Sequence, residues 1–151
     1  MSATELLAEL VAADSTNPDL EPGGAGEAAV AAIMAARLAA AGLEVDVWEA
    51  APGRPNVVGR LPGLGGGRSL MLCGHTDVVG AAPGAFVPSV RDGRMHGRGT
   101  CDMKAGIAAA LMADADRGRS APQAQGSFYN EGADGNGMKG WKQTARLEGL
   151  R

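Results

Sequence analysis

Two short segments of the chain carry the side chains best suited to chemistry. The first places His75 at the end of an apolar stretch, with Asp77 two residues later. The second places Asp102 directly behind the glycine-rich residues 97–101. A neutral imidazole is a good ligand for a divalent transition metal, and a nearby carboxylate can orient it by accepting its second N–H. Since a carboxylate can also bridge two cations, the two segments together predict part of a metal site.

Each of these residues also has a purely structural interpretation. His75 could lie in a turn that Asp77 caps, and Asp102 could be the N-cap of a helix, a position that favours Asp. Two further candidates are weaker. His96 lies in an expected hairpin that faces water, and Cys101 is notable only as the neighbour of Asp102. The metal site is favoured when the first three residues are considered together.

The periodicity of the apolar residues predicts the elements that position these side chains. Ser2 and Glu5 form a capping box that begins a first helix. The continuous apolar run 69–73 is typical of a strand buried on both faces. The other predicted elements are a helix at 27–41, strands at 43–48 and 56–61, a hairpin at 90–95 and a helix that begins at Asp102. This order predicts an α/β fold with three layers, α/β/α, and a mixed, partly parallel sheet.

The character of the sequence changes after residue 113. In an alternating α/β chain another buried strand is expected there, and only Phe128 and Tyr129 hint at one. We therefore expect residues 1–113 to form the packed part of a domain. Residues 114–151 are expected to be an atypical tail that is irregular or poorly packed.

Composition and charge exclude several classes of function. The chain has 151 residues and a net charge of −3, whereas nucleic acids and anionic membranes require a basic surface. We therefore expect no nucleic-acid partner and no membrane partner. The first residues contain neither a basic leader nor an apolar signal core, and two cysteines do not make a disulfide framework. Cytoplasmic residence is the resulting expectation.

Longer motifs around the candidate residues resemble those of a known enzyme family. The motifs cover residues 75–79 and 92–106, with the opening segments 14–18 and 23–27. Over roughly residues 1–113 the chain resembles the acetylornithine deacetylase/succinyl-diaminopimelate desuccinylase/aminoacylase family of metal-dependent amidohydrolases and exopeptidases. The resemblance implies a catalytic domain like that of the zinc exopeptidases, of which residues 1–113 would be the N-terminal part.

The resemblance also implies a role for each candidate residue. His75 would bind one metal ion, Asp102 would bridge two, and Asp77 would orient His75, with a cis peptide bond after Asp102. The ions would be zinc, or else cobalt or manganese. In the family reaction, water activated by the metal attacks the amide carbonyl of an N-acyl amino acid or short peptide, while a glutamate carries the proton. The implied partner is therefore a small-molecule substrate.

The chain departs from the family pattern where paired glutamates should end a buried strand. Glu131 matches the general acid/base, whereas Gly132 stands in the place of the metal-binding glutamate. Asp134 is a poor substitute for that ligand. A solvated loop charge is the plainer interpretation of Glu131.

These departures predict a weakly active or inactive form of such a hydrolase. The remaining ligands of the family and its usual dimerisation domain lie beyond this sequence, so the chain would bind one ion or none, and a homodimer is left open. Truncation, a shifted reading frame and sequence decay would each account for the tail. The alternative is a non-catalytic α/β module, derived from such an enzyme, that binds a ligand or another subunit.

Overall fold

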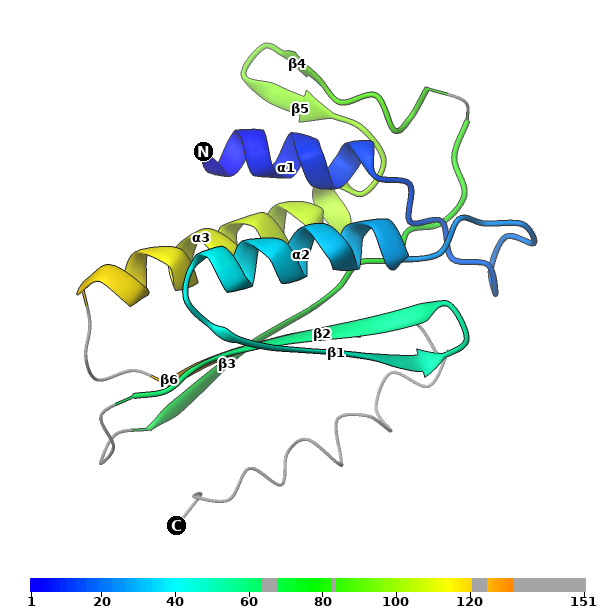
Figure 1. Cartoon of the computed structure of the whole chain (residues 1–151). Coiled ribbons are helices and arrows are strands. Elements are labelled where there is room, and N and C mark those ends of the chain that lie inside the picture. Colours follow the sequence, from blue (N-terminus) through cyan, green and yellow to red (C-terminus); the bar gives the residue numbers. More distant parts are fainter. Residues whose placement is uncertain (64–67, 83, 121–124, 132–151) are drawn as a thin grey trace.

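The computed structural model of the chain describes residues 1–63, 68–82, 84–120 and 125–131, with side chains described up to residue 113 (Figure 1). The helices are α1 (Ala3–Ala12), α2 (Ala28–Ala40) and α3 (Ala105–Ser120). The strands are β1 (Glu44–Ala51), β2 (Arg54–Leu61), β3 (Ser69–His75), β4 (Ser89–Arg91), β5 (Arg94–His96) and β6 (Gln125–Glu131). An irregular turn, Thr100–Lys104, leads directly into α3.

Four of the strands form one mixed sheet in the order β1-β2-β6-β3. β2 is antiparallel to both β1 and β6, whereas β6 and β3 are parallel. β4 and β5 form a separate antiparallel hairpin. The predicted α/β class, the mixed sheet and the hairpin are thus confirmed. All three helices lie on the same face of the sheet (Figure 1), so the described residues supply the sheet and one helical layer.

The hydrophobic core lies between these helices and the sheet. At the start of α1, Ser2 Oγ accepts a hydrogen bond from the Glu5 amide (3.2 Å), and Glu5 Oε2 accepts one from the Ser2 amide (2.7 Å). This reciprocal pair confirms the predicted capping box and fixes where the chain enters the core. The core is built from the buried side chains of Leu6, Leu10, Val30, Met34, Leu38, Val57, Ile107 and Leu111.

Part of the sheet is open to solvent in the described part of the chain. Leu70 on β3 is 39% exposed, and Cys73 on the same strand is exposed. On β1, Val47 is 54% exposed and Trp48 is 39% exposed. The prediction that residues 69–73 are buried on both faces is therefore wrong, because the described helices cover only one face of the sheet.

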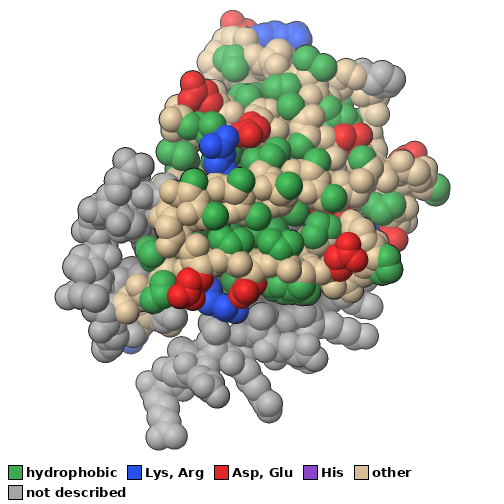
Figure 2. Space-filling view, in the orientation of Figure 1, with side chains coloured by type: hydrophobic (Ala, Val, Ile, Leu, Met, Phe, Trp, Pro, Cys, Tyr) green, Lys and Arg blue, Asp and Glu red, His purple; other side chains and the backbone are tan. Residues whose placement is uncertain are grey.

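On the face seen in Figure 2, Lys and Arg side chains lie beside Asp or Glu, while some other acidic side chains stand alone. Arg37 pairs with Glu9 and Arg60 pairs with Asp46, each with an N–O distance of 2.6 Å. Such exposed pairs contribute about 0–1 kcal/mol each, so burial of the core dominates stability. None of the described helices combines the length and the apolar character needed to cross a bilayer.

The backbone beyond residue 113 differs from the expected irregular tail. α3 continues to Ser120, and β6 joins the sheet between β2 and β3. The polar residues within 125–131 hide this strand from an analysis of apolar periodicity, whereas the backbone of β6 pairs with a neighbour on each side. A boundary between two parts of the chain near residue 113 stays a prediction.

Candidate metal centre

His75 is the last residue of β3 and lies between two carboxylates. Its Nδ1 is 3.1 Å from Asp77 Oδ1 and 3.2 Å from the Asp77 carbonyl oxygen. Its Nε2 is 3.0 Å from Asp102 Oδ1. The structure thus brings together the three residues that the sequence singles out, with one carboxylate on each ring nitrogen. We refer to His75, Asp77 and Asp102 as the triad.

The turn Thr100–Lys104 gives Asp102 its place in the triad. Asp102 has φ −129° and ψ 98°, values outside the helical region, and the Asp102–Met103 peptide bond is cis. The cis bond expected from the resemblance is confirmed. α3 begins only at Ala105, so the prediction that Asp102 opens this helix is wrong. A glycine is needed before the turn, because Gly99 has φ +84° and a Cβ there would lie 2.9 Å from Val78 Cγ1.

The two carboxylates of the triad differ in their exposure. The Asp102 side chain is 86% exposed, whereas that of Asp77 is 12% exposed and that of His75 is 37% exposed. Asp77 Oδ2 accepts a further hydrogen bond from Asn17 Nδ2 at 2.8 Å. Asp77 is therefore held from both sides, while Asp102 can reach an ion or a substrate that arrives from solvent.

Charge and hydrogen bonding shift the pKa values of His75 and Asp77. Burial alone would raise the pKa of Asp77, yet hydrogen bonds from His75 and Asn17 hold it below its usual value. The hydrogen bond to Asp77 raises the pKa of His75 to about 9 against the opposing effect of burial, and Asp102 adds to the rise. The triad therefore stabilises positive charge at the imidazole, and a divalent cation beside Nε2 would meet the Asp102 carboxylate on that side of the ring.

The donor atoms of the triad are of the types that zinc prefers. Zn–N and Zn–O bonds are about 2.0–2.2 Å long, so two ligands at a tetrahedral angle lie about 3.3 Å apart. The 3.0 Å between His75 Nε2 and Asp102 Oδ1 is close to that spacing. Among the residues with described side chains, however, no group of three or more His, Cys, Asp or Glu could hold a metal ion. The described residues therefore offer two ligands and one orienting carboxylate.

The other residues singled out by sequence lie in different surroundings. Glu131 ends β6, and its Cα is the register partner of His75 in the parallel pair β3–β6. Its backbone is therefore in a strand rather than in the loop of the plainer interpretation, while its side chain, Gly132 and Asp134 lie outside the described residues. His96 is exposed in β5, as expected for a hairpin that faces water, and Cys101 is exposed in the turn before α3.

Two residues beside the triad were given no role by the sequence analysis. Asn17 binds Asp77, and Lys104 is fully buried, with its ammonium donating to the carbonyl oxygens of Leu10 (2.9 Å) and Ala13 (2.8 Å). Lys104 thereby ties the end of α1 to the turn that carries Asp102. The sequence feature that could have identified Asn17 and Lys104 is their position inside the motifs at residues 14–18 and 92–106.

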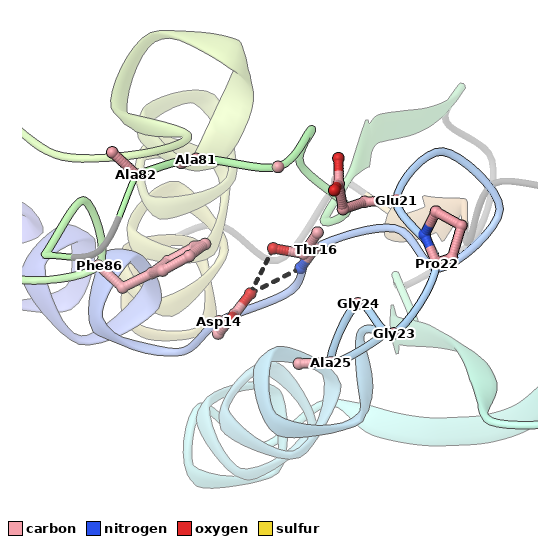
Figure 3. A pocket seen from close by; sticks show the side chains of 11 residues that line it. Asp14, Thr16, Glu21, Pro22, Gly23, Gly24, Ala25, Ala81, Ala82 and Phe86 are labelled. Carbon is pink, nitrogen blue, oxygen red and sulfur yellow. Dashed lines mark hydrogen bonds between the residues drawn. The ribbon is translucent and has the colours of Figure 1, made fainter.

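A hollow of about 540 Å³ lies near this region and is drawn in Figure 3. Asp14 and Glu21 line it, together with Phe86 and with small residues of 22–25 and 80–82. Asp14 Oδ1 accepts hydrogen bonds from the amide (2.8 Å) and the hydroxyl (2.6 Å) of Thr16. Of the described residues that line the hollow, none belongs to the triad, so it is a separate feature of the surface.

Comparison of the sequence with curated proteins finds desuccinylases. The chain is 39% identical over 117 residues to the succinyl-diaminopimelate desuccinylase of Leptothrix cholodnii, an alignment that covers 72% of this chain and 29% of that protein. It is 34% identical to the succinyl-diaminopimelate desuccinylase of Stenotrophomonas maltophilia, over all of this chain and 40% of that protein. The chain thus spans well under half the length of these curated relatives.

Comparison of the fold finds peptidases. Human carnosine dipeptidase 1 superposes with a TM-score of 0.77 at 21% identity, over 95% of this chain and 34% of that structure. A Zn-dependent exopeptidase from Parabacteroides distasonis superposes with a TM-score of 0.57 at 19% identity, over 85% of this chain and 44% of that structure. At these identities the likeness shows a shared fold.

The family comparison covers the stretch from β3 to β6. Residues 71–129 match the model described as Peptidase family M20/M25/M40, and this stretch contains all three residues of the triad. The relatives extend the match to the remainder of the chain. Over residues 71–129 the chain matches Peptidase family M20/M25/M40, and the chain is similar to an N-terminal part of the succinyl-diaminopimelate desuccinylases.

Proposed function

We propose that this chain provides part of the active site of a metal-dependent hydrolase that cleaves the amide bond of an N-acyl amino acid or short peptide. The observation that best supports this proposal is the distance of 3.0 Å between His75 Nε2 and Asp102 Oδ1, while Asp77 binds the other ring nitrogen of His75. The desuccinylase relatives support the deacetylase or desuccinylase type of reaction and a small-molecule substrate. Residence in the cytoplasm is part of the same proposal.

Each residue of the triad has its own role in this proposal. His75 and Asp102 would hold the metal, Asp102 would be the residue that bridges two ions, and Asp77 would fix the tautomer and direction of the His75 ring. When bound, zinc, cobalt or manganese would polarise the amide carbonyl and lower the pKa of a water molecule. Glu131, whose backbone lies beside that of His75, is the candidate for the group that moves the proton.

We further propose that the chain by itself binds one ion or none and is weakly active or inactive. Two protein ligands hold a divalent cation poorly, and the described side chains offer only two at the triad. Gly132 has no side chain to replace the glutamate that the resemblance places there. The same shortage of ligands favours the second candidate function, a non-catalytic α/β module, derived from such an enzyme, that binds a ligand or another subunit.

Cobalt titration followed by visible absorption tests this proposal. The proposed metal roles predict that zinc displaces any Co²⁺ that the chain binds, and that His75→Ala and Asp102→Ala abolish this binding. His96→Ala is the matched control, because it removes the other histidine of the chain without touching the triad. Binding that survives His75→Ala would contradict the metal roles. A folded chain that binds no cobalt would favour the non-catalytic module.

Hydrolysis is measured in the same preparations. Release of amine from N-acetyl and N-succinyl amino acids reports amidohydrolase activity in the presence of zinc, cobalt or manganese. Activity that disappears in His75→Ala would establish the reaction and contradict the expected inactivity of the chain on its own. Cobalt binding without hydrolysis would agree with a site that lacks further ligands.

A further inference from the structure

We propose that Asn17 is a positioning residue of this centre: its amide fixes the Asp77 carboxylate, which in turn holds the His75 ring with Nε2 directed at Asp102. The inference rests on the proposed function, because it concerns the direction in which a proposed metal ligand points. Its evidence is a chain of hydrogen bonds that links two segments 60 residues apart in sequence.

The contact between Asn17 and Asp77 completes the hydrogen bonding of a largely buried carboxylate. Asn17 Nδ2 donates to Asp77 Oδ2 at 2.8 Å, and Asp77 Oδ1 lies 3.1 Å from His75 Nδ1. Asn17 is 2% exposed, so water has little access to replace its amide. Each carboxylate oxygen of Asp77 therefore has its own partner, and the plane of the carboxylate is fixed by both.

The orientation of the Asn17 amide follows from its second hydrogen bond. Asn17 Oδ1 accepts from the backbone N–H of Asp19 at 2.9 Å. A backbone N–H can only donate and an ionised carboxylate can only accept, so the amide cannot be flipped without the loss of both bonds. Asn17 thus presents a donor to Asp77.

The backbone around Asn17 is paired with the backbone around Asp77. The Asn17 amide donates to the Val78 carbonyl oxygen (2.9 Å), and the Val78 amide donates to the Ser15 carbonyl oxygen (3.0 Å). The buried hydroxyl of Ser15 donates to the Thr76 carbonyl oxygen at 2.6 Å. The two backbone bonds hold residues 15–17 alongside 76–78, so the Asn17 side chain starts from a fixed position.

A buried ion pair anchors the far side of the same segment. Arg54 on β2 binds both carboxylate oxygens of Glu27, at 2.6 and 2.7 Å, and its third nitrogen binds Asp19 Oδ2 at 2.6 Å. The Glu27 side chain is 0% exposed and that of Arg54 is 5% exposed. Asp19, which donates its N–H to Asn17, is therefore tied to the sheet.

Removal of the Asn17 donor should make the orientation of the His75 imidazole less fixed, because Asn17 acts on the ring through Asp77. Asp77 Oδ2 would lose its partner, and the carboxylate could rotate away from His75 Nδ1. Residues that orient metal-binding histidines are typically worth about 10–100-fold in metal affinity. Because Asn17 acts through one more residue, we expect a loss near the lower end, about tenfold.

The test reads the His75 ring directly, in the metal-free chain. The sequence contains two histidines, so proton–nitrogen NMR spectra of the imidazole side chains contain two ring systems, and His96→Gln assigns them. We expect a downfield, slowly exchanging Nδ1–H proton for His75, bonded to Asp77. In Asn17→Ala, which removes the side-chain amide and with it the donor to Asp77, this signal should disappear or move upfield. Asn17→Ser supplies a second replacement, which is polar but shorter than Asn.

Ser15→Ala is the matched control, because Ser15 makes a buried hydrogen bond in the same pair of segments but does not touch Asp77. Its His75 signal should match the wild type, and its cobalt affinity should stay within about twofold, against about tenfold for the Asn17 variants. Wild-type ring signals in both Asn17 variants would overturn the proposal, as would an equal change in Ser15→Ala. If the wild type binds no cobalt while the ring signal responds to Asn17, the metal-dependent function gives way to the non-catalytic module and the positioning role stands.

Discussion

His75 and Glu131 are register partners on the neighbouring parallel strands β3 and β6. Both residues end their strands, so their backbones lie side by side at the same edge of the sheet. The ends of strands in open α/β sheets are where such folds place their ligands. This relationship makes Glu131, rather than a residue of the hairpin, the first candidate for proton transfer.

Glu131→Gln tests that assignment. We expect any His75-dependent hydrolysis to fall by about 10²-fold or more, because the amide cannot carry a proton between water and the leaving amine. Cobalt affinity should change little, since Glu131 is proposed to move protons and not to bind metal. Initial rates and cobalt titrations on the same preparations separate the two effects. A loss of cobalt binding in Glu131→Gln would instead make this residue a ligand.

If the chain holds one ion at the triad, zinc should raise its thermal stability. A ligand that binds only the folded state at about a hundred times its dissociation constant adds about 2.7 kcal/mol to the free energy of unfolding. We expect the melting temperature, followed by circular dichroism, to rise with zinc and to return when a chelator is added. His75→Ala should melt at the same temperature with and without zinc. A zinc-dependent rise in that variant would place the ion elsewhere.

Gly99→Ala should destabilise the turn that carries Asp102. Gly99 has φ +84°, and a Cβ there would meet Val78 Cγ1 at 2.9 Å and Lys104 Cδ at 3.0 Å. We expect a loss of about 1–3 kcal/mol in the free energy of unfolding, measured by urea denaturation. Gly93→Ala is the matched control, because Gly93 has φ +71° but no atom within 4 Å of the added Cβ. Equal losses in both variants would show that close packing at Gly99 contributes nothing.

Lys104 should make the free energy of unfolding depend on pH in the alkaline range. Burial lowers the pKa of Lys104 from 10.5 to about 8, so the folded chain releases a proton that the unfolded chain still holds. The free energy of unfolding therefore gains a contribution that is absent below about pH 8 and grows up to about pH 10.5, with an upper limit of about 3 kcal/mol.

Lys104→Met removes this contribution and keeps an apolar chain of similar length. Urea denaturation across that pH range should show the wild type gaining stability relative to the variant as pH rises. A difference between the two proteins that stays constant from about pH 8 to about pH 10.5 would contradict the lowered pKa of Lys104.

Local signals in the sequence were sufficient for much of the fold. The capping box of Ser2 and Glu5 involves residues three apart, so their spacing alone identified the start of α1. His75 and Asp77 are two residues apart at the end of a strand, and the predicted contact between them follows from that short separation. Such features depend on neighbours in sequence, which a single chain displays directly.

Features that depend on distant segments could not be predicted in the same way. The bond from Asn17 to Asp77 joins segments 60 residues apart, and no local pattern identifies it. The helix was expected to begin at Asp102 because Asp favours N-caps, whereas the structure places an irregular turn there to direct Asp102 at His75. The prediction that β3 is buried on both faces was wrong, because burial of a strand depends on which segments cover each face of the sheet.

The strand order also has a consequence for biosynthesis. Among the described strands, β3 has one neighbour in the four-stranded sheet, and that neighbour is β6, the last strand to be synthesised. Register partners on β3 and β6 lie more than fifty residues apart in sequence. The ribosome therefore releases β3, which carries His75, well before β6 emerges. Until β6 emerges, β1 and β2 can pair with each other as a hairpin. β3 then lacks its partner strand, and its unpaired backbone groups form an edge that chaperones or other nascent chains can bind.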